Sequence, residues 1–280
     1  MRIRLDIAYD GTHFRGWARQ PTLRTVQGTL EQALSRIVGS EVQFVVAGRT
    51  DAGVHASGQV AHVDLDEEQW GRIESRHGKA SVDPAGSIAG RMRGVLGAYS
   101  DVTVTRSSIA PEGFDARFSA VWRRYRYRLA DEETGFDPLR RLDTTSFRGR
   151  LDVQAMDAAA RTLIGLHDFA AYCKPREGAT TIRTLLDYRW ERDEEGVLIA
   201  EVKADAFCHS MVRALVGACV AVGDGRLGID EVVALRDALT RTSAFKVLAA
   251  RGLALVEVGY PADDLLTLRA EQTRARRDSE

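Results

Sequence analysis

The sequence predicts an α+β fold made of two ferredoxin-like half-units, each with a mixed, largely antiparallel sheet flanked by helices. Apolar and polar residues alternate in runs such as 2–9, which is typical of half-buried strands. Amphipathic helical stretches separate these runs, so the first half follows the split order β-α-β-β-α-β. The same order returns after residue 121 with one added helix. We therefore expect two related sheets whose faces meet around a central cleft.

The first half contains a strand, a capped helix and a run of shorter elements. Ile3, Leu5 and Ile7 mark the buried face of the first strand. Thr25 is the expected N-cap of a helix that Gly39 ends. The remaining elements are strands at 42–47, 61–65 and 101–106, a polar surface segment with some helix at 67–82, and a helix at 83–96 that begins at Asp83-Pro84.

The second half begins with a strand at 121–129 that has two different faces. One face carries Val121, Arg123, Tyr125, Tyr127 and Leu129, and the other carries Trp122, Arg124, Arg126 and Arg128. Helices are expected at 152–163, 209–222 and 230–239, and strands at 181–191, 197–206 and 253–260. We predict an N-terminal domain at 1–107, a C-terminal domain at 108–265 and a charged, frayed tail at 266–280.

Composition limits the class of protein. The chain of 280 residues is 44% hydrophobic and 28% charged, so it is long and apolar enough to bury a sizeable core. There is no apolar run of 18 residues, and the N-terminus is a charged strand rather than a signal peptide, so we expect a cytoplasmic protein without membrane association. Cys173, Cys208 and Cys219 are odd in number and lack CxxC spacing, so neither a disulfide framework nor a metal site is expected.

A glycine-punctuated loop joins two of the predicted strands and reads GRTDAGVHASGQVAH from residue 48 to residue 62. Asp51 follows Arg49 by two residues, and the guanidinium favours the ionised carboxylate. Gly48 and Gly53 allow a ligand to approach the backbone closely. The alternative is a hairpin turn, in which Asp-x-Gly serves only backbone geometry.

This loop closely resembles the catalytic signature of the tRNA pseudouridine synthase A family. The resemblance continues through about residues 1–261, in YDG at 9–11, GW at 16–17, FDARFSA at 114–120, RYRY at 124–127, HDF at 167–169, Phe207 with MVR at 211–213, and GL at 252–253. It implies the pseudouridine synthase fold, whose half-units are RRM-like. Cys208 departs from the family pattern, which has a larger apolar residue there.

The reaction implied by the resemblance breaks the N1–C1′ bond of uridine, turns the uracil and rejoins it through C5. Nothing is oxidised and no group leaves the site, so no cofactor and no metal are expected. Asp51 is the implied catalytic carboxylate and nucleophile; attack on the ribose, attack on the base and abstraction of a ribose proton all remain open. Arg49 is expected to hold Asp51 ionised and to help displace the target base. Tyr125 is expected to stack on the uracil or hydrogen-bond near it, with a core tyrosine as the alternative.

Three further residues have a structural alternative. Arg213, at a predicted helix start, pairs with Asp51 or with phosphate, or forms a structural salt bridge. His55 and His62 are general-base or RNA-contacting candidates, but a histidine in a hairpin commonly satisfies only local hydrogen bonds.

Arginines interleaved with aromatic residues predict RNA contacts. The candidates for phosphate contact are Arg15 and Arg19 in the loop 9–22, and Arg123, Arg124, Arg126 and Arg128 in the strand 121–129. The alternatives are an aromatic lid over the core for the loop and a solvated edge strand for the second group. The resemblance further implies a homodimer that holds tRNA near the anticodon stem-loop and modifies positions 38, 39 and 40.

Two competing functions have distinct signatures. A catalytically silent RNA-binding module would bind tRNA without forming product. A nucleoside or glycoside hydrolase would release free uracil, but it would need a second flanking carboxylate, and the signature loop offers only Asp51.

Overall fold

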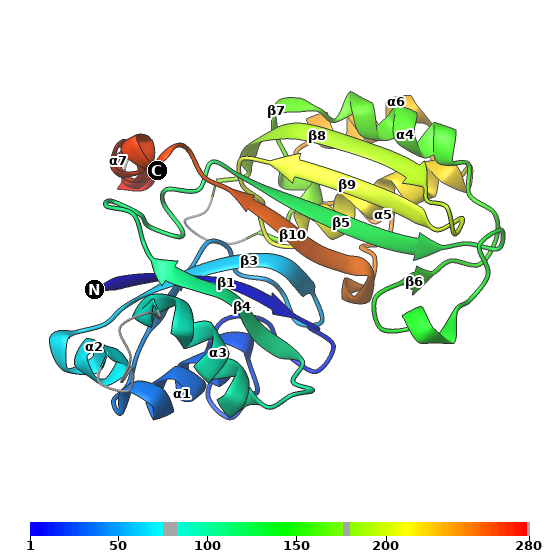
Figure 1. Ribbon diagram of the computed structural model, residues 1–280. Helices are drawn as coiled ribbons and strands as arrows, with labels where there is room; N and C mark the ends of the chain where they lie inside the picture. Colours follow the sequence, from blue (N-terminus) through cyan, green and yellow to red (C-terminus); the bar gives the residue numbers. More distant parts are fainter. Residues whose placement is uncertain (75–82, 176–179, 279–280) are drawn as a thin grey trace. The chain divides into compact units, whose positions relative to one another are not determined.

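The computed structural model describes residues 1–74, 83–175 and 180–278 (Figure 1). The chain divides into two compact units, the first comprising Met1–Val121 with Leu255–Ser279 and the second Trp122–Ala254. Both units combine a sheet with helices, which confirms the α+β class. The chain passes from the second unit back to the first within strand β10 (Leu253–Gly259).

The first unit has the predicted element order. Its elements are β1 (Arg2–Tyr9), α1 (Val26–Val38), β2 (Phe44–Val46), β3 (His55–Asp64), α2 (Glu67–Glu74), α3 (Pro84–Leu96) and β4 (Val102–Ile109). The strands run β4-β1-β3, β2 also pairs with β3, and all these pairs are antiparallel. This is the sheet order that the split β-α-β pattern produces. Residues 75–82, the end of the predicted polar segment, lie outside the described residues.

Local sequence explains these elements well. Ile3, Leu5 and Ile7 are fully buried while the residues between them are half-buried, as their alternation predicts. The hydroxyl of Thr25 accepts a hydrogen bond from the backbone N–H of Gly28, and Gly39 ends α1 in the left-handed conformation with φ 81°.

The second unit repeats this order with additions. Its elements are β5 (Trp122–Ala130), the 3₁₀ turn η1 (Pro138–Arg140), β6 (Thr145–Ser146), α4 (Val153–Thr162), β7 (Gly165–Asp168), the 3₁₀ turn η2 (Ala170–Tyr172), β8 (Ile182–Arg192), β9 (Leu198–Ala204), α5 (Met211–Gly223), α6 (Ile229–Asp237) and the 3₁₀ turn η3 (Ala250–Gly252). The strands run β5-β9-β8-β7, which places β5, β9 and β8 as β1, β3 and β2 are placed in the first unit. The short strands β6 and β7 were not expected, because two to four residues carry too little periodicity to predict.

The boundary between the units differs from the expected one at 107/108. Residues 110–121 belong to the first unit because they pack there: Phe114 is 1% exposed, and the backbone N–H of Ala116 donates to His62 Nδ1 at 3.0 Å. The hydroxyl of Tyr260 donates to the carbonyl of the same Ala116 at 2.7 Å. The segment therefore adheres to β3 and to the end of β10 in the first unit.

The charged tail is a helix rather than a frayed end. After a 3₁₀ turn, η4 (Asp263–Leu265), helix α7 spans Leu266–Asp278. Leu266 and Ala270, one helical turn apart, are buried, and Arg274 forms an ion pair with Asp115 at 2.9 Å. Two buried apolar positions and one ion pair thus dock a helix that is mostly polar, which periodicity alone did not reveal.

Two cysteines are joined, contrary to the expectation from their number and spacing. Cys173, directly after η2, forms a disulfide with Cys208, which precedes α5, and their Cα atoms lie 5.8 Å apart. Cys219 is free and buried in α5, and burial raises the pKa of its thiol to about 12. The pairing was missed because the two residues are 35 positions apart in the sequence and only the tertiary fold brings them together.

Candidate active site

Asp51 lies on the loop between β2 and β3 in the first unit, where the sequence predicted it. Its side chain is half-buried, whereas Arg49 is exposed. The backbone N–H of Val54 donates to the carbonyl of Asp51 at 3.2 Å, and Gly53 adopts φ 78°, so the residues after Asp51 form a tight turn. The left-handed glycine explains why the signature requires Gly at this position.

A second loop, residues 10–17, supports the Asp51 loop on both sides of the carboxylate. On one side the N–H of Trp17 donates to the carbonyl of Thr50 at 3.0 Å, and on the other the N–H of Gly53 donates to the carbonyl of Phe14 at 3.3 Å. A Cβ at Gly11 would lie 2.0 Å from the carbonyl oxygen of Val54. The absence of a side chain at Gly11 is therefore what allows the two backbones to touch.

A buried hydrogen-bond network holds the residue next to Asp51. The Tyr9 hydroxyl lies 2.8 Å from Thr50 Oγ1, and Gln59 Nε2 donates both to that hydroxyl at 3.2 Å and to the carbonyl of Gly48 at 2.9 Å. Burial raises the pKa of Tyr9 to about 12, so its hydroxyl keeps its proton at neutral pH. The network joins both ends of the segment that leads into Asp51.

His55 makes local contacts with the loop 10–17. It is 8% exposed, its Nδ1 accepts from the N–H of Gly11 at 3.1 Å, and the same nitrogen lies 3.1 Å from Asp10 Oδ1. Burial by itself would raise the pKa of Asp10, but the hydrogen bonds from the hydroxyl and N–H of Thr12 outweigh it and hold that pKa below its ordinary value. His55 thus attaches the start of β3 to the loop 10–17.

His62 is also a structural histidine. It is 2% exposed, and its Nδ1 accepts the hydrogen bond from Ala116 already described. Burial, followed by the nearby charge of Arg2, lowers its pKa, so the imidazole is neutral at pH 7 and suited to accept.

The loop 9–22 buries its large aromatic side chains and exposes its arginines. Phe14 and Trp17 are buried, and the Tyr9 and Trp17 rings lie 6.1 Å apart, so the aromatic residues form a lid over the core. Arg15 and Arg19 are exposed, with Arg19 3.8 Å from the carboxylate of Glu31. The aromatic residues of this loop therefore belong to the core, and its two arginines face solvent.

Tyr125 lies in the second unit, on the face of β5 that also carries the buried Tyr127 and Leu129. It is 8% exposed and opposes Val202 of β9. Its ring meets that of Phe207 edge-on, with centroids 5.1 Å apart and an interplanar angle of 87°. Arg213, in the first turn of α5, donates from Nε to the carbonyl of Leu248 at 2.6 Å.

The opposite face of β5 carries the predicted row of arginines. Two of these arginines, together with one from β8, surround the carboxylate of Glu201. Glu201 of β9 is 7% exposed; it lies 2.7 Å from Arg126 and 3.7 Å from Arg124, and it also pairs with Arg189. Burial would raise the pKa of Glu201, but Arg126, Arg189 and Arg124 hold it below its ordinary value. Arg189 also pairs with Asp187 at 2.8 Å, so three guanidinium groups meet two carboxylates and one positive charge is left in excess.

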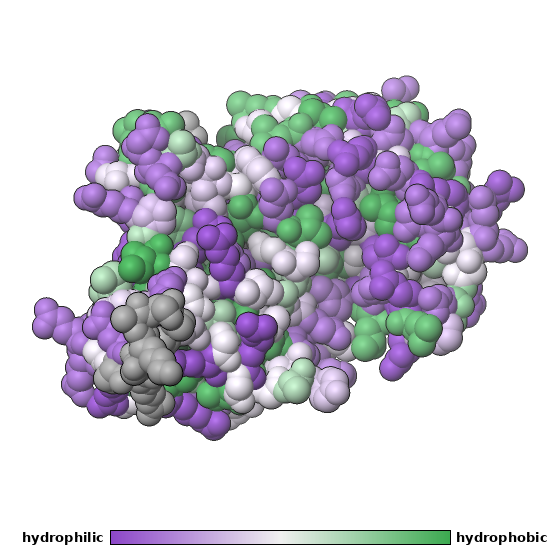
Figure 2. Space-filling view, in the orientation of Figure 1, coloured by the Kyte–Doolittle hydropathy of each residue, from purple (hydrophilic) through white to green (hydrophobic). Residues whose placement is uncertain are grey.

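Arg128 and Arg123 are engaged differently. Arg128 lies 3.4 Å from Asp193 and 3.7 Å from Glu195, and its side chain is 17% exposed. Arg123 donates to the carbonyl of Asp205 at 2.8 Å. Seen from this side, the surface over β5, β8 and β9 is mostly hydrophilic (Figure 2). The row is therefore basic around Glu201 and neutralised at its Arg128 end.

In the part of the chain that the structure describes, no three His, Cys, Asp or Glu side chains gather as a metal-binding group. No helix there combines the length and the apolar character that crossing a membrane requires.

Comparison with known proteins decides the family. Residues 7–85 and 159–261 match the family described as tRNA pseudouridine synthase. The chain belongs to the tRNA pseudouridine synthase family. Three proteins called tRNA pseudouridine synthase A are similar to it over nearly their whole length: that of Leifsonia xyli subsp. xyli is 61% identical (99% of this chain, 97% of the relative), that of Frankia casuarinae 53% (99% and 96%), and that of Streptomyces griseus 50% (98% and 93%).

Membership makes this synthase an isomerase of the class that converts uridine to pseudouridine in tRNA. The structure also shows supporting residues that the sequence did not single out. Tyr9 was visible in the YDG motif but was given no role, and Thr50 and Gln59 lie within the signature without a distinct signal. Glu201 is recognised only from its neighbours in the folded chain, and the contact of Phe207, a residue of the family resemblance, with Tyr125 is visible only there.

Proposed function

We propose that Asp51 is the catalytic nucleophile of the isomerisation and that the tRNA substrate is modified in its anticodon stem-loop, at positions 38, 39 and 40. The evidence for the role of Asp51 is that the backbone on both sides of it is held by hydrogen bonds. Thr50 and Gly53, the residues flanking the Asp51–Ala52 pair, are each hydrogen-bonded to the loop 10–17, and the Tyr9 network holds Thr50 a second time. A carboxylate held in this way loses little orientational freedom when it acts.

The other candidate residues are assigned complementary roles. Arg49 is exposed, two residues before Asp51 in the sequence, and is proposed to displace the target base from the stack. Tyr125 presents a nearly buried ring and is proposed to contact the flipped uracil. Arg213 is proposed to bind substrate, with its Nε anchored on Leu248 and its position therefore defined.

The reaction needs no second substrate besides the RNA. The N1–C1′ bond breaks, the uracil turns, C5 bonds to C1′, the C5 proton leaves to solvent and N1 gains a proton, so substrate and product are isomers. The protein must keep the detached uracil in place, and the rigid, partly buried loop of Asp51 suits that task. We propose that no cofactor or metal takes part.

The tRNA is proposed to bind through the exposed arginines. Arg15 and Arg19 in the first unit, and Arg124 and Arg126 with Arg123 in the second, are the candidates for phosphate contact. Arg128 contributes least, since Asp193 and Glu195 already neutralise it. We further propose that the enzyme acts in the cytoplasm as a homodimer.

The test uses unmodified tRNA carrying tritium at C5 of uridine. The wild-type enzyme is expected to release the label to water, and Asp51→Asn is expected to abolish release while tRNA binding stays within about twofold. Release of free uracil would instead indicate a hydrolase, and binding without any release by wild type would indicate a silent module. Asp66→Asn, at an acid between β3 and α2, is the matched control and should leave release unchanged.

A further inference from the structure

The ring of Phe207 packs against the ring of Tyr125. The two rings meet edge-on at 5.1 Å and 87°, a geometry that restricts rotation of the tyrosine ring. Tyr125 itself stands on a strand paired on its β9 side with Val202, so its backbone is fixed. Phe207 stands on the connection between β9 and α5, and its position depends on how that connection is held.

The connection is anchored at both ends by hydrogen bonds. At its start, the N–H of Asp205 donates to the carbonyl of Thr184 at 3.1 Å, and Asp205 Oδ1 accepts from the N–H of Thr184 at 3.0 Å. At its end, the N–H of Met211 donates to the carbonyl of Cys208 at 3.1 Å as α5 begins. Phe207 lies between these two anchors.

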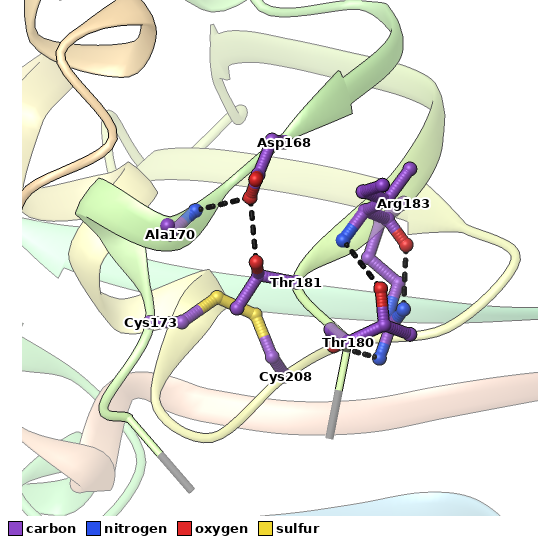
Figure 3. The surroundings of a disulfide bond; sticks show 8 residues. Asp168, Ala170, Cys173, Thr180, Thr181, Arg183 and Cys208 are labelled. Atoms are coloured by element: carbon purple, nitrogen blue, oxygen red, sulfur yellow. Dashed lines mark hydrogen bonds between the residues drawn. A yellow bond between two sulfur atoms is a disulfide. The ribbon is translucent and has the colours of Figure 1, made fainter. Parts of the chain in front are cut away.

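The disulfide supplies the cross-link in the middle. Cys208, next to Phe207, is bonded to Cys173 (Figure 3). The N–H of Lys174, the residue after Cys173, donates to the carbonyl of His209 at 2.9 Å. The Cys173 side is rigid, because Phe169 and Tyr172 are buried and Asp168 Oδ1 accepts from the N–H of Ala170 at 3.0 Å and from the hydroxyl of Thr181 at 2.6 Å. The bond therefore ties the Phe207 segment to a fixed element.

We propose that Phe207 is a positioning residue for Tyr125 and that the Cys173–Cys208 bond is a reversible strap that holds it, so that turnover depends on the oxidation state of this pair. The proposal rests on the function assigned above to Tyr125. Where a compartment keeps thiols reduced, a protein disulfide is usually transient or redox-sensing rather than structural. Breaking the bond leaves the segment with its hydrogen bonds at Asp205, at Met211 and from Lys174, but without a covalent link.

The accessibility of the two sulfurs fits a reversible reaction with a peroxide. Cys173 is 1% exposed and Cys208 is half-buried, so Cys208 is the side chain that hydrogen peroxide reaches first. Its thiolate attacks one peroxide oxygen to give a sulfenic acid, and the Cys173 thiol then displaces water to form the S–S bond. Two thiols and one peroxide thus give one disulfide and two waters, and a dithiol reductant reverses the change.

The first experiment compares the full-length wild-type enzyme after peroxide and after dithiothreitol. Alkylation under denaturing conditions should label one thiol per chain in the oxidised form and all three cysteines in the reduced form. The single-turnover rate constant for tritium release, measured with enzyme in excess so that an inactive fraction does not affect it, should be about threefold lower in the reduced form. The KM for tRNA should not change.

Variants separate the strap from the positioning residue. The double variant Cys173→Ser/Cys208→Ser should have the single-turnover rate constant of the reduced wild type, and peroxide should not change it. The rate constant of Cys219→Ser should respond to peroxide as that of the wild type does. Phe207→Leu should lower the rate constant about tenfold and lose the redox response, and Phe207→Tyr, which keeps the ring, should restore most of the rate.

The outcomes distinguish this proposal from the function it rests on. Three labelled thiols after peroxide, or equal rates in both redox states, would overturn the strap. A Phe207→Leu variant with the wild-type rate constant, or one whose loss is confined to thermal stability, would overturn the positioning role. If Asp51→Asn itself retained full tritium release, the assigned function would fail whatever the behaviour of Phe207.

Discussion

The contact between the loop 10–17 and the Asp51 loop depends on a missing side chain, and Gly11→Ala tests it. A Cβ there would lie 2.0 Å from the carbonyl oxygen and 2.5 Å from the carbonyl carbon of Val54. Both are backbone atoms, so they cannot rotate away as a side chain would. The two loops must separate by about 1 Å to reach even a tight contact, and the hydrogen bond from Gly11 to His55 lengthens with them.

A displacement of this size next to the catalytic carboxylate is expected to lower the single-turnover rate constant about 100-fold. Tritium release from labelled tRNA measures the rate, a tRNA binding assay run in parallel should change little, and thermal unfolding reports the loss of stability. The expected pattern is a large loss of rate with binding retained.

Two other glycines in the first unit provide controls. Gly90→Ala in α3 meets nothing within 4 Å and should slightly stabilise the helix, by about 0.5 kcal/mol, with no effect on rate. Gly58→Ala meets the backbone of Val256 at 2.1 Å, a clash as severe as that of Gly11 but directed at β10. If Gly11→Ala turned over like wild type, or lost no more rate than Gly58→Ala at an equal loss of stability, the loop 10–17 would not position Asp51.

Three further predictions test the network, the arginine row and a buried ion pair. Tyr9→Phe removes one hydroxyl and leaves Thr50 and Gln59 without it, so stability should fall by about 1 kcal/mol and the single-turnover rate by about tenfold; retention of the full rate would show that the network only stabilises the fold. Arg126→Ala should reduce the slope of log binding constant against log salt for tRNA by about 0.8, whereas Arg128→Ala should leave it unchanged, and equal slopes for both would contradict phosphate contact at Arg126. Burial would raise the pKa of Asp131, but hydrogen bonds from Arg192 and from the backbone of Leu151 and Thr134 hold it well below its ordinary value. The carboxylate therefore stabilises the fold at pH above about 4 and loses that contribution as the pH falls further. Asp131→Asn should lower the free energy of unfolding, measured in urea, by about 3 kcal/mol at pH 7 and by less at pH 3. An equal loss of unfolding free energy at the two pH values would refute the assignment.

Local sequence was sufficient to predict those features of the fold that depend on residues a few positions apart. The alternation of Ile3, Leu5 and Ile7 determines which face of β1 is buried, and the two faces of β5 follow from the same two-residue period. Thr25 and Gly39 determine the ends of α1 because caps act over three or four residues. The signature from residue 48 to residue 62 likewise located the Asp51 loop and, through its resemblance to known proteins, the family.

Only the tertiary structure decided the contacts between residues distant in sequence. Glu201 lies 75 positions from Arg126, Gln59 lies 50 positions from Tyr9, and Arg274 lies 159 positions from Asp115, so no local pattern contains these pairs. The same holds for the bond between Cys173 and Cys208, which the sequence argued against. A two-residue or 3.6-residue period reports how one segment meets its own surroundings, whereas pairings across the sheet depend on which strands become neighbours, and that is settled when the whole core is buried together.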